Sequence, residues 1–384
     1  MSENNMKRLG DYIRPVDVRN RDLNVTRLLG VSITKEFMPS IANIVGTDLS
    51  AYKVVTKGQF AYGPVTSRNG DKISVALLDG YDDAIISQVY TVFEVVDKNA
   101  LDPEYLMMWF RRPEFDRYAR FHSHGSAREV FDWEEMCEVQ VPVPAIEKQR
   151  EIVAEYNTLA TRIETNKKLI ATLEQTAQTL YRHTFVDNID PNNLPDGWRM
   201  GVFTDLVKIG GGGTPSTSVI EYWQNGDVPF YAPGDKTNEY YSLETEKHIT
   251  QLGLSKCSSK LYPQNTTFVT ARGATTGGIS LSAKPMAMNQ TCFALLPLNP
   301  NSEFYTHQVS LETLASLKTE AIGATFEALT TIDFQKKAVI VPSVGTIQKF
   351  NTEISPLYSK ILLKQKENQT LTQMQTLLLS KMGV

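Results

Sequence analysis

The sequence predicts an α+β protein made of two similar domains, each followed by a long helix. Three observations lead to this prediction. A chain of 384 residues is too long for one ordinary core and fits two domains of roughly 150 residues with connecting segments. The two halves repeat each other at a fixed offset. Each half ends in a segment with the periodicity of a long helix.

The repeat joins the end of the first half to the end of the chain. Residues 141–181 align without a gap with residues 339–379, at an offset of 198. The same offset carries Gly125 onto Gly323, so the match extends back into the preceding domain. An internal repeat of this length indicates that one structural unit occurs twice.

Each half mixes strand-like runs with a short helix. Stretches such as KISVALL in the first half and TTFVTA in the second are typical of β-strands. A helix that buries Leu106, Trp109 and Phe110 is expected after Asp102. Between the halves, DNIDPNNLPDGW is typical of a turn-rich linker. We therefore expect a domain at 1–143, a helix at 144–186, a linker at 187–197, a second domain at 198–341 and a helix at 342–384.

The two long helices carry a narrow apolar stripe with a spacing of three or four residues, which is typical of a coiled coil. A helix lying on a globular core would show a wider apolar face. Polar residues interrupt the stripe and can fix register and partner, so we expect the helices to pair as an antiparallel coiled coil. The predicted seam comprises Ile152, Tyr156, Leu159, Ile163, Asn166, Ile170, Leu173, Ala177 and Leu180 in the first helix, and Leu357, Ile361, Lys364, Asn368, Leu371, Gln375 and Leu378 in the second.

Pro356 interrupts the second helical pattern, because proline cannot donate the helical hydrogen bond. Two interpretations are open. Either Ser355 caps a helix that starts at Pro356, or a longer helix kinks there.

Composition and charge set limits on function. The net charge of -4 provides no overall attraction to nucleic acid, so any DNA-binding surface must come from local clusters of basic residues. No apolar run approaches the length of a membrane span or a signal peptide, so we expect a cytoplasmic protein with no membrane partner. The three cysteines are far apart, and we expect them to be small buried residues in a reducing compartment.

Several apparent motifs have plainer explanations than catalysis. The glycines at 210–213 lack the Lys-Ser/Thr pair of a phosphate loop, so they suggest a flexible turn. His122 and His124 have no third ligand at metal-binding spacing, so a solvent-facing or phosphate-contacting loop is expected. No nucleophile-elbow motif and no methyltransferase motif occurs. We therefore expect no catalytic residue, no cofactor and no metal in this chain.

The order of short motifs resembles one known family. The second half contains GGGGTPS, VPFYAPGDK, TARGATTGG, MNQT and GATFEALT, and the first contains GSAREVFDW followed by PVPAIEKQREIV. Arranged before two heptad helices, these strings resemble the specificity subunits of type I restriction-modification systems over essentially the whole chain. The first half departs from the pattern, because it has VTSRNGDK in place of TARGATTGG and lacks the glycine-rich segment.

The resemblance implies two target-recognition domains, 1–143 and 198–341, that each recognise one half of a bipartite double-stranded DNA target. It also implies two modification (methyltransferase) subunits, and restriction (endonuclease/translocase) subunits, as partners that supply the chemistry. The paired helices would hold the domains apart over an unrecognised spacer. The rival interpretation is a non-catalytic adaptor that binds proteins and whose helices only dimerise.

Candidate DNA-binding residues follow from this resemblance and from their chemistry. Arg68 and Arg272 each lie beside a glycine in a loop between apolar runs, where a guanidinium can reach a guanine edge or a phosphate. The amides of Asn289 and Gln290 suit adenine, but they can equally hold the domain's own backbone. The full set is Arg68, Lys72, Arg120, His122, Arg128, Lys236, Arg272, Thr275, Asn289 and Gln290.

Overall fold

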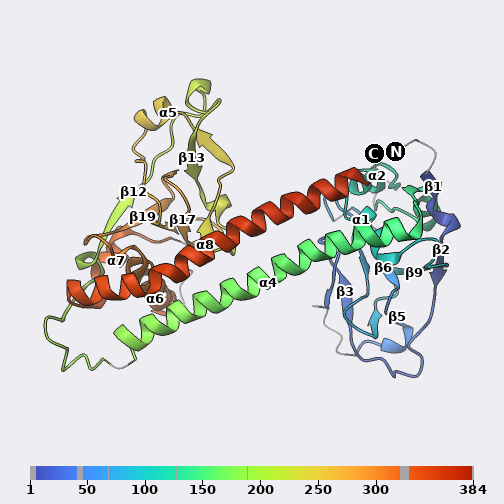
Figure 1. Ribbon diagram of the computed structural model, residues 1–384, viewed down its shortest axis with the longest axis horizontal. Coiled ribbons are helices and arrows are strands. Elements are labelled where there is room, and N and C mark those ends of the chain that lie inside the picture. The colour runs from blue at the N-terminus through green and yellow to red at the C-terminus, as the bar shows by residue number, and fades with distance from the viewer. Residues whose placement is uncertain are drawn as a thin grey trace. The chain divides into compact units, whose positions relative to one another are not determined.

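The computed structural model describes residues 6–40, 46–67, 69–125, 128–187, 189–320 and 328–382. The chain forms two compact units, the first from residues 1–161 with 371–384 and the second from residues 162–370. The two long helices are α4 (Ile146–Phe185) and α8 (Val344–Lys381) (Figure 1). Each helix is divided between the two units.

The first unit combines short antiparallel sheets with helices. Its main sheet has the strand order β2-β9-β6-β7, and the pairs β1–β10, β3–β4 and β5–β8 form separate two-stranded sheets. The strands are β1 (Met6–Arg8), β2 (Ile13–Val16), β3 (Leu29–Val31), β4 (Phe37–Pro39), β5 (Lys53–Thr56), β6 (Phe60–Tyr62), β7 (Val75–Leu77), β8 (Asp83–Ile86), β9 (Thr91–Val95) and β10 (Gln140–Pro142). The α-helices are α1 (Pro103–Phe110), α2 (Pro113–Phe121) and α3 (Trp133–Glu138), with short 3₁₀ turns η2 (Leu9–Asp11) and η3 (Leu49–Ala51).

Helix α1 confirms the prediction made from Asp102. The Asp102 carboxylate accepts hydrogen bonds from the backbone N–H groups of Glu104 and Tyr105, which satisfies two free donors of the first turn. The predicted apolar residues of α1 are buried, and they pack against Phe60 and Phe93 of the main sheet. The core of the first unit therefore lies between this sheet and its helices.

The second unit has a larger main sheet, with the strand order β12-β19-β16-β17-β14, beside a three-stranded sheet of order β15-β13-β18 and the pair β11–β20. The strands are β11 (Arg199–Val202), β12 (Val207–Gly211), β13 (Val228–Tyr231), β14 (Tyr241–Ser242), β15 (Lys247–Ile249), β16 (Thr267–Thr270), β17 (Ile279–Ser282), β18 (Ala287–Met288), β19 (Cys292–Pro297) and β20 (Ala338–Val341). The helices are α5 (Gln251–Ser255), α6 (Glu303–Glu320) and α7 (Thr331–Lys336), with 3₁₀ turns η4 (Phe203–Asp205), η5 (Ile220–Tyr222) and η6 (Pro233–Asp235).

The core of the second unit brings the sheet, α6 and both long helices together. Buried residues of the sheet such as Leu281 and Leu295 share one cluster with Val309 of α6, Tyr181 of α4 and Tyr358 of α8. A continuous core of this kind explains why this part of each long helix belongs to the second unit.

The internal repeat predicted from the sequence is present in the structure. Helices α3 and α7, strands β10 and β20, and helices α4 and α8 all begin at positions that differ by the same 198 residues. The backbone N–H of Leu9 donates to the carbonyl of Val139, and the N–H of Phe203 donates to that of Lys337 in the same relation. The strand order β2-β9-β6-β7 recurs as β12-β19-β16-β17. The same arrangement of strands and helices, here called the frame, therefore occurs twice in the chain.

Pro356 lies inside helix α8, which decides between the two interpretations of this residue. The helix runs without interruption from Val344 to Lys381 with Pro356 inside it, so a helix that starts at Pro356 is ruled out. The expectation for the cysteines holds only in part, since Cys292 is buried while Cys137 and Cys257 are half-buried.

Candidate nucleic-acid interface

In the first unit, the loop after β6 and the segment after α2 lie together. The backbone N–H of Thr66 donates to the carbonyl of Glu129 at 3.0 Å, and the Thr66 hydroxyl lies 2.9 Å from that of Ser123. Val65 and Val130 form an isolated antiparallel bridge. The structure thereby brings the predicted residues of these two loops to one region, with the exception of Arg68, which lies outside the described residues.

The basic side chains of this region differ in their partners. Lys72 and Arg128 are exposed, and neither has an ion pair among the described residues. Arg120, at the end of α2, pairs with the carboxylate of Glu129. Gly125 turns the chain between these residues with φ of +129°, and a Cβ there would meet the Arg128 carbonyl at 2.3 Å. The loop therefore requires glycine at this position.

His122 has a carboxylate partner that its sequence neighbours did not indicate. Its Nδ1 lies 3.1 Å from Glu135, and His124 Nε2 lies 3.5 Å from the same carboxylate. The His122 ring also stacks on Tyr118 at 4.2 Å. No group of three His, Cys, Asp or Glu side chains in the described part of the chain could hold a metal ion.

In the second unit, four loops meet at one end of the main sheet. The backbone N–H of Ala271 donates to Thr291, and the Thr275 hydroxyl donates to the carbonyl of Pro233 at 3.4 Å. The Thr214 hydroxyl donates to the side chain of Gln290. These contacts bring Lys236, Arg272, Thr275, Asn289 and Gln290 to neighbouring loops.

Arg272 is exposed at the start of its loop and forms an antiparallel bridge with Ala328. Because Val130 and Ala328 are equivalent positions of the repeat, Arg272 stands where the first unit has Val65. The two loops therefore connect equivalent strands, and Arg272 occupies the position that Val65 has in the first unit, which the sequence could not establish.

The glycine run before Thr214 is not the flexible turn that the sequence suggested. Gly210 and Gly211 belong to strand β12, and the N–H of Gly213 donates to the carbonyl of Met288. A Cβ on Gly212 would meet the Asn289 carbonyl at 1.9 Å. The glycines thus allow close packing of two backbones.

Asn289 binds the domain's own backbone, which was one of the two interpretations left open by the sequence. Its Oδ1 accepts hydrogen bonds from the N–H of Thr291 at 3.0 Å and from the Thr291 hydroxyl at 2.9 Å. Gln290 is exposed, and its Oε1 accepts a hydrogen bond from Thr214, while no partner for its amide nitrogen occurs among the described residues.

Lys236 lies in a half-buried setting beside two carboxylates. Burial lowers the pKa of Lys236, and the charges of Glu239 and Glu174 oppose this effect. Burial raises the pKa of Glu174, on α4, to about 7, with a further contribution from Glu239. Gln365 of α8 donates to Glu239 and accepts from the N–H of Tyr241, so this loop is fixed to a long helix.

Within the second unit, α4 and α8 contact each other in antiparallel order. Arg162 lies 2.6 Å from Glu367, and the Asn166 amide donates to Asn368 at 2.9 Å. Further along α4, the Tyr181 ring contacts that of Phe350, which lies earlier in α8. The two cationic neighbours, Arg162 and Lys364, lower the pKa of Glu367 to about 2.

The predicted seam residues are all at least partly buried, with one exception. Leu180 is 40% exposed and that prediction is wrong, because Tyr181 takes the buried position. Tyr358 is fully buried beside the half-buried Leu357, and the sequence analysis missed it. The other predicted positions divide into buried Asn166, Ile170, Ala177, Ile361, Lys364 and Asn368, and half-buried Ile152, Tyr156, Leu159, Ile163, Leu173, Leu371, Gln375 and Leu378.

Within the first unit, the other ends of the helices form an apolar groove. Leu378, Leu379 and Met382 of α8 join the core cluster that contains Val153 of α4. The groove beside them has a volume of about 430 Å³ and is lined by Glu155, Thr158, Leu159, Met374, Leu377, Leu378 and Lys381. Leu377 is 55% exposed there.

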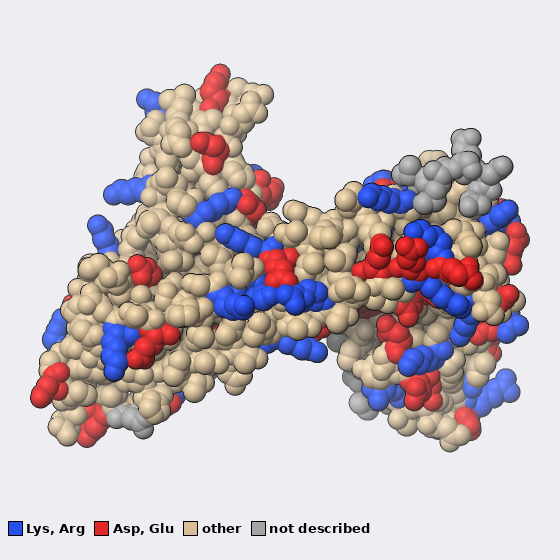
Figure 2. All heavy atoms as spheres, in the orientation of Figure 1, with Lys and Arg blue, Asp and Glu red and all other residues tan. Residues whose placement is uncertain are grey.

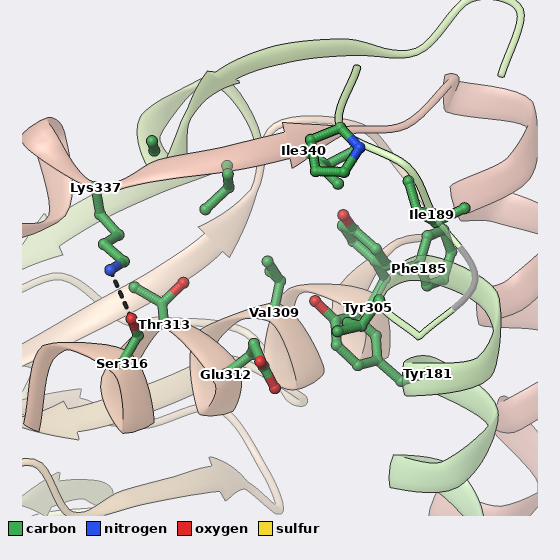
Figure 3. Close-up of a pocket in the computed structure, with 14 residues that line it drawn as sticks. Tyr181, Phe185, Ile189, Tyr305, Val309, Glu312, Thr313, Ser316, Lys337 and Ile340 are labelled. Carbon is green, nitrogen blue, oxygen red and sulfur yellow. Dashed lines mark hydrogen bonds between the residues drawn. The ribbon is translucent and has the colours of Figure 1, made fainter. Parts of the chain in front are cut away.

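Figure 3 shows a separate cavity of about 360 Å³ in the second unit. Tyr181, Phe185 and Tyr305 line one side, and the Lys337 ammonium donates to the Ser316 hydroxyl on the other (Figure 3). None of the predicted DNA-binding residues lines it. Burial raises the pKa of the Cys292 thiol to about 12, which leaves this cysteine a poor nucleophile.

Positive side chains gather over the part of α4 and α8 that belongs to the second unit (Figure 2). Exposed basic residues near the middle of the two helices include Arg162, Lys167, Lys168, Lys360 and Lys366. A chain with negative net charge therefore carries a local basic surface, as DNA binding would require. Among the residues that the structure describes, no helix has the length and apolar character needed to cross a membrane.

Comparison with known proteins identifies the class to which this frame belongs. Residues 51–175 and 195–373 match the family model described as the type I restriction modification DNA specificity domain, and the chain belongs to this family. The resemblance predicted from the sequence is thereby confirmed.

Individual relatives agree with the family. The chain is 25% identical over an alignment of 452 residues to the type I restriction enzyme HindI specificity subunit of Haemophilus influenzae, covering 97% of each protein. It is 31% identical over 186 residues to the MjaIX specificity subunit of Methanocaldococcus jannaschii, covering 47% of this chain and 43% of that protein. The crystal structure of a type I restriction-modification S subunit from M. genitalium has the same fold, with a TM-score of 0.62 at 14% identity, covering 100% of this chain and 98% of that one.

Proposed function

We propose that this specificity subunit recognises a bipartite double-stranded DNA target, with residues 1–143 binding one half-site and residues 198–341 the other. One observation carries the proposal. The same strand order recurs in both units, and in each the loop between equivalent strands, β6–β7 or β16–β17, meets the segment that precedes α3 or α7. Two similar surfaces with different side chains suit two different half-sites.

The residues proposed to contact DNA have distinct roles. Lys72 and Arg128 are exposed and have no ion pair among the described residues, so they suit phosphate contacts, which fix the position of the protein on DNA without depending on base sequence. Arg272 and the free amide of Gln290 suit base edges, guanine for the arginine and adenine for the amide. The remaining predicted residues either contact DNA as well or support the residues that do. They are Arg68, Arg120, His122, Lys236, Thr275 and Asn289.

The chain needs partners for the chemistry, because we assign no catalytic residue to it. Two modification subunits, bound through the long helices, would methylate an adenine in each half-site, and restriction subunits would join the larger assembly in the cytoplasm. The exposed Leu377 in the apolar groove supports a helical partner on the first unit. The intrachain contact of Asn166 with Asn368 argues against helices that serve only to dimerise two chains.

Methylation mapping tests the proposal. The chain is expressed with its modification subunit in cells that otherwise lack adenine methylation, and methylated adenines are located by sequencing. The expected result is one motif made of two short half-sites around an unspecified spacer. The purified chain alone should transfer no labelled methyl group. Methylation without the partner, or a continuous motif, would contradict the proposal.

A further inference from the structure

Phe121 is the most exposed of the large apolar side chains that the structure describes. Its side chain is 82% exposed, followed by Ile220 at 62%. It is the last residue of α2, where Phe115 and Ala119 face the core. Single exposed apolar residues are common on proteins, so this exposure needs support from its surroundings before it indicates a function.

The ring is held by a chain of aromatic contacts. Phe121 meets His122 edge to face at 5.1 Å, and His122 stacks on Tyr118 at 4.2 Å. Tyr118 contacts the buried Phe131. The Nδ1 atom of His122 lies 3.1 Å from the carboxylate of Glu135. Phe121 therefore projects into solvent from a support that ends in the half-buried Tyr118 and the buried Phe131.

Three arginines lie near Phe121 along the chain. Arg117 lies one turn before Phe121 on α2, which places both on the same side of the helix. Arg120 precedes Phe121, and the exposed Arg128 follows in the loop that joins Thr66. Arg117 and Arg120 are paired with Glu114 and Glu129 at the surface, and such exposed pairs are weak enough for phosphates to replace the carboxylates.

We infer that Phe121 inserts between two stacked base pairs at the half-site bound by the first unit, while the neighbouring arginines hold phosphates on either side. The inference rests on the proposed function and adds an interaction to it. Apolar side chains that enter a base step unstack it partly and kink the duplex, and the gained contact offsets the lost stacking. A protein partner at this ring would instead need apolar neighbours, and the residues around it are charged.

An unstacked step also bears on the methylation itself. An adenine must leave the duplex before its exocyclic nitrogen can reach a methyltransferase site, and this extrusion costs less where stacking is already disturbed. Phe121 would then be a positioning residue of the specificity subunit that deforms the DNA, with no contact to the methyl donor.

The test uses the complete complex of this chain with its modification subunit, without methyl donor. A fluorescent adenine analogue that brightens on unstacking is placed at each permitted position of the mapped motif in turn. Wild type, Phe121→Ala and Phe121→Leu are compared, with Val96→Ala as the control, because Val96 is a 55% exposed apolar residue of the same unit. Affinity for the target and assembly without DNA are measured in parallel.

We expect a bright position in the first half-site that Phe121→Ala loses, that Phe121→Leu largely keeps, and that Val96→Ala does not change. Affinity should fall about 10-fold for Phe121→Ala, within the range of stacking contacts. Equal signals and affinities for wild type and Phe121→Ala would overturn the inference and leave the proposed function intact. Weakened assembly in the absence of DNA would overturn it in favour of a protein contact. A wild-type complex that selects no DNA target would instead overturn the proposed function, and this inference with it.

Discussion

The two units share a frame and differ in what the frame carries. The globular part of each unit begins with a strand, a 3₁₀ turn and a second strand that belongs to the main sheet. It ends with a capped short helix and a strand, which the long helix follows. The first unit adds the β3–β4 and β5–β8 pairs, whereas the second adds a three-stranded sheet and strand β14. The repeated part fixes how each long helix is attached, and the variable part gives each unit different strands and loops.

The buried ion pair of the first unit gives the largest expected effect. Lys35 lies 2.6 Å from Asp116, with side chains only 6% and 10% exposed, and joins the β3–β4 hairpin to α2. Lys35→Ala leaves a buried carboxylate without its cation and should cost about 3 kcal/mol of unfolding free energy. Thermal and urea unfolding measure the loss. The double variant Lys35→Met with Asp116→Leu should lose much less, and an equal loss in both would show that charge burial is not the cause.

The next effect concerns DNA recognition by one unit alone. Arg272→Ala should weaken binding by about 1–3 kcal/mol, the value of a good contact to a base. It should relax the motif only in the half-site bound by residues 198–341. Quantitative binding to targets altered in one half-site at a time measures this, with the exposed Lys349→Ala of α8 as control. Relaxation in both half-sites would argue against two independent surfaces.

A smaller effect is expected where the two helices meet. Asn166→Ala removes the amide that donates to Asn368, so unfolding free energy should fall by about 1 kcal/mol. Replacing both asparagines with leucine should restore or raise stability, because apolar pairs pack well at such positions, while relaxing the register. Unfolding curves and crosslinking between the helices separate stability from register. A double variant less stable than the single one would contradict this account.

The smallest effect is the pH response of Glu174. The folded state raises its pKa from 4.5 to about 7, so the folded protein binds more protons between these values. This contribution to stability is present below about pH 4.5 and is lost as pH rises through about 7. Glu174→Gln should therefore remove part of the decline in stability between about pH 4.5 and 7, on the order of 1 kcal/mol. The exposed Glu164→Gln on the same helix is the control, and an equal response in both variants would exclude Glu174 as the source.

The sequence predicted the frame better than the surfaces. The helix cap at Asp102, the strands and the repeat depend on local chemistry and spacing, and all are found. The seam was only partly predictable, because a globular domain packs on α8 from the side and widens its buried face to Ile354, Tyr358 and Gln365. The rejected alternative of a broader amphipathic face thus applies within the second unit.

The contacts of the candidate DNA-binding residues were harder to predict than the helices and strands, because their partners are distant in sequence. Glu135 faces two histidines from a neighbouring helix, and Glu239 reaches Glu174 and Gln365 from a loop. Arg272 aligns with Val65 only when the backbone bridges are seen. No sequence periodicity indicates contacts of this kind.

We propose that the length of the paired helices sets the length of the unrecognised spacer between the two half-sites, and measuring the spacer tests this central claim most directly. One heptad is inserted after Thr161 in α4 and one after Thr370 in α8, at the unit boundary, which leaves the contacts of Arg162 and Asn166 intact. Seven residues add roughly 10 Å of helix, the length of about three stacked base pairs, and return the seam to nearly the same side.

Mapping methylated adenines should then show both half-sites unchanged and a spacer longer by about two to three base pairs. Insertion of two residues instead should abolish activity, because it turns the buried stripe away from its partner. An active heptad variant whose spacer is unchanged would contradict the account.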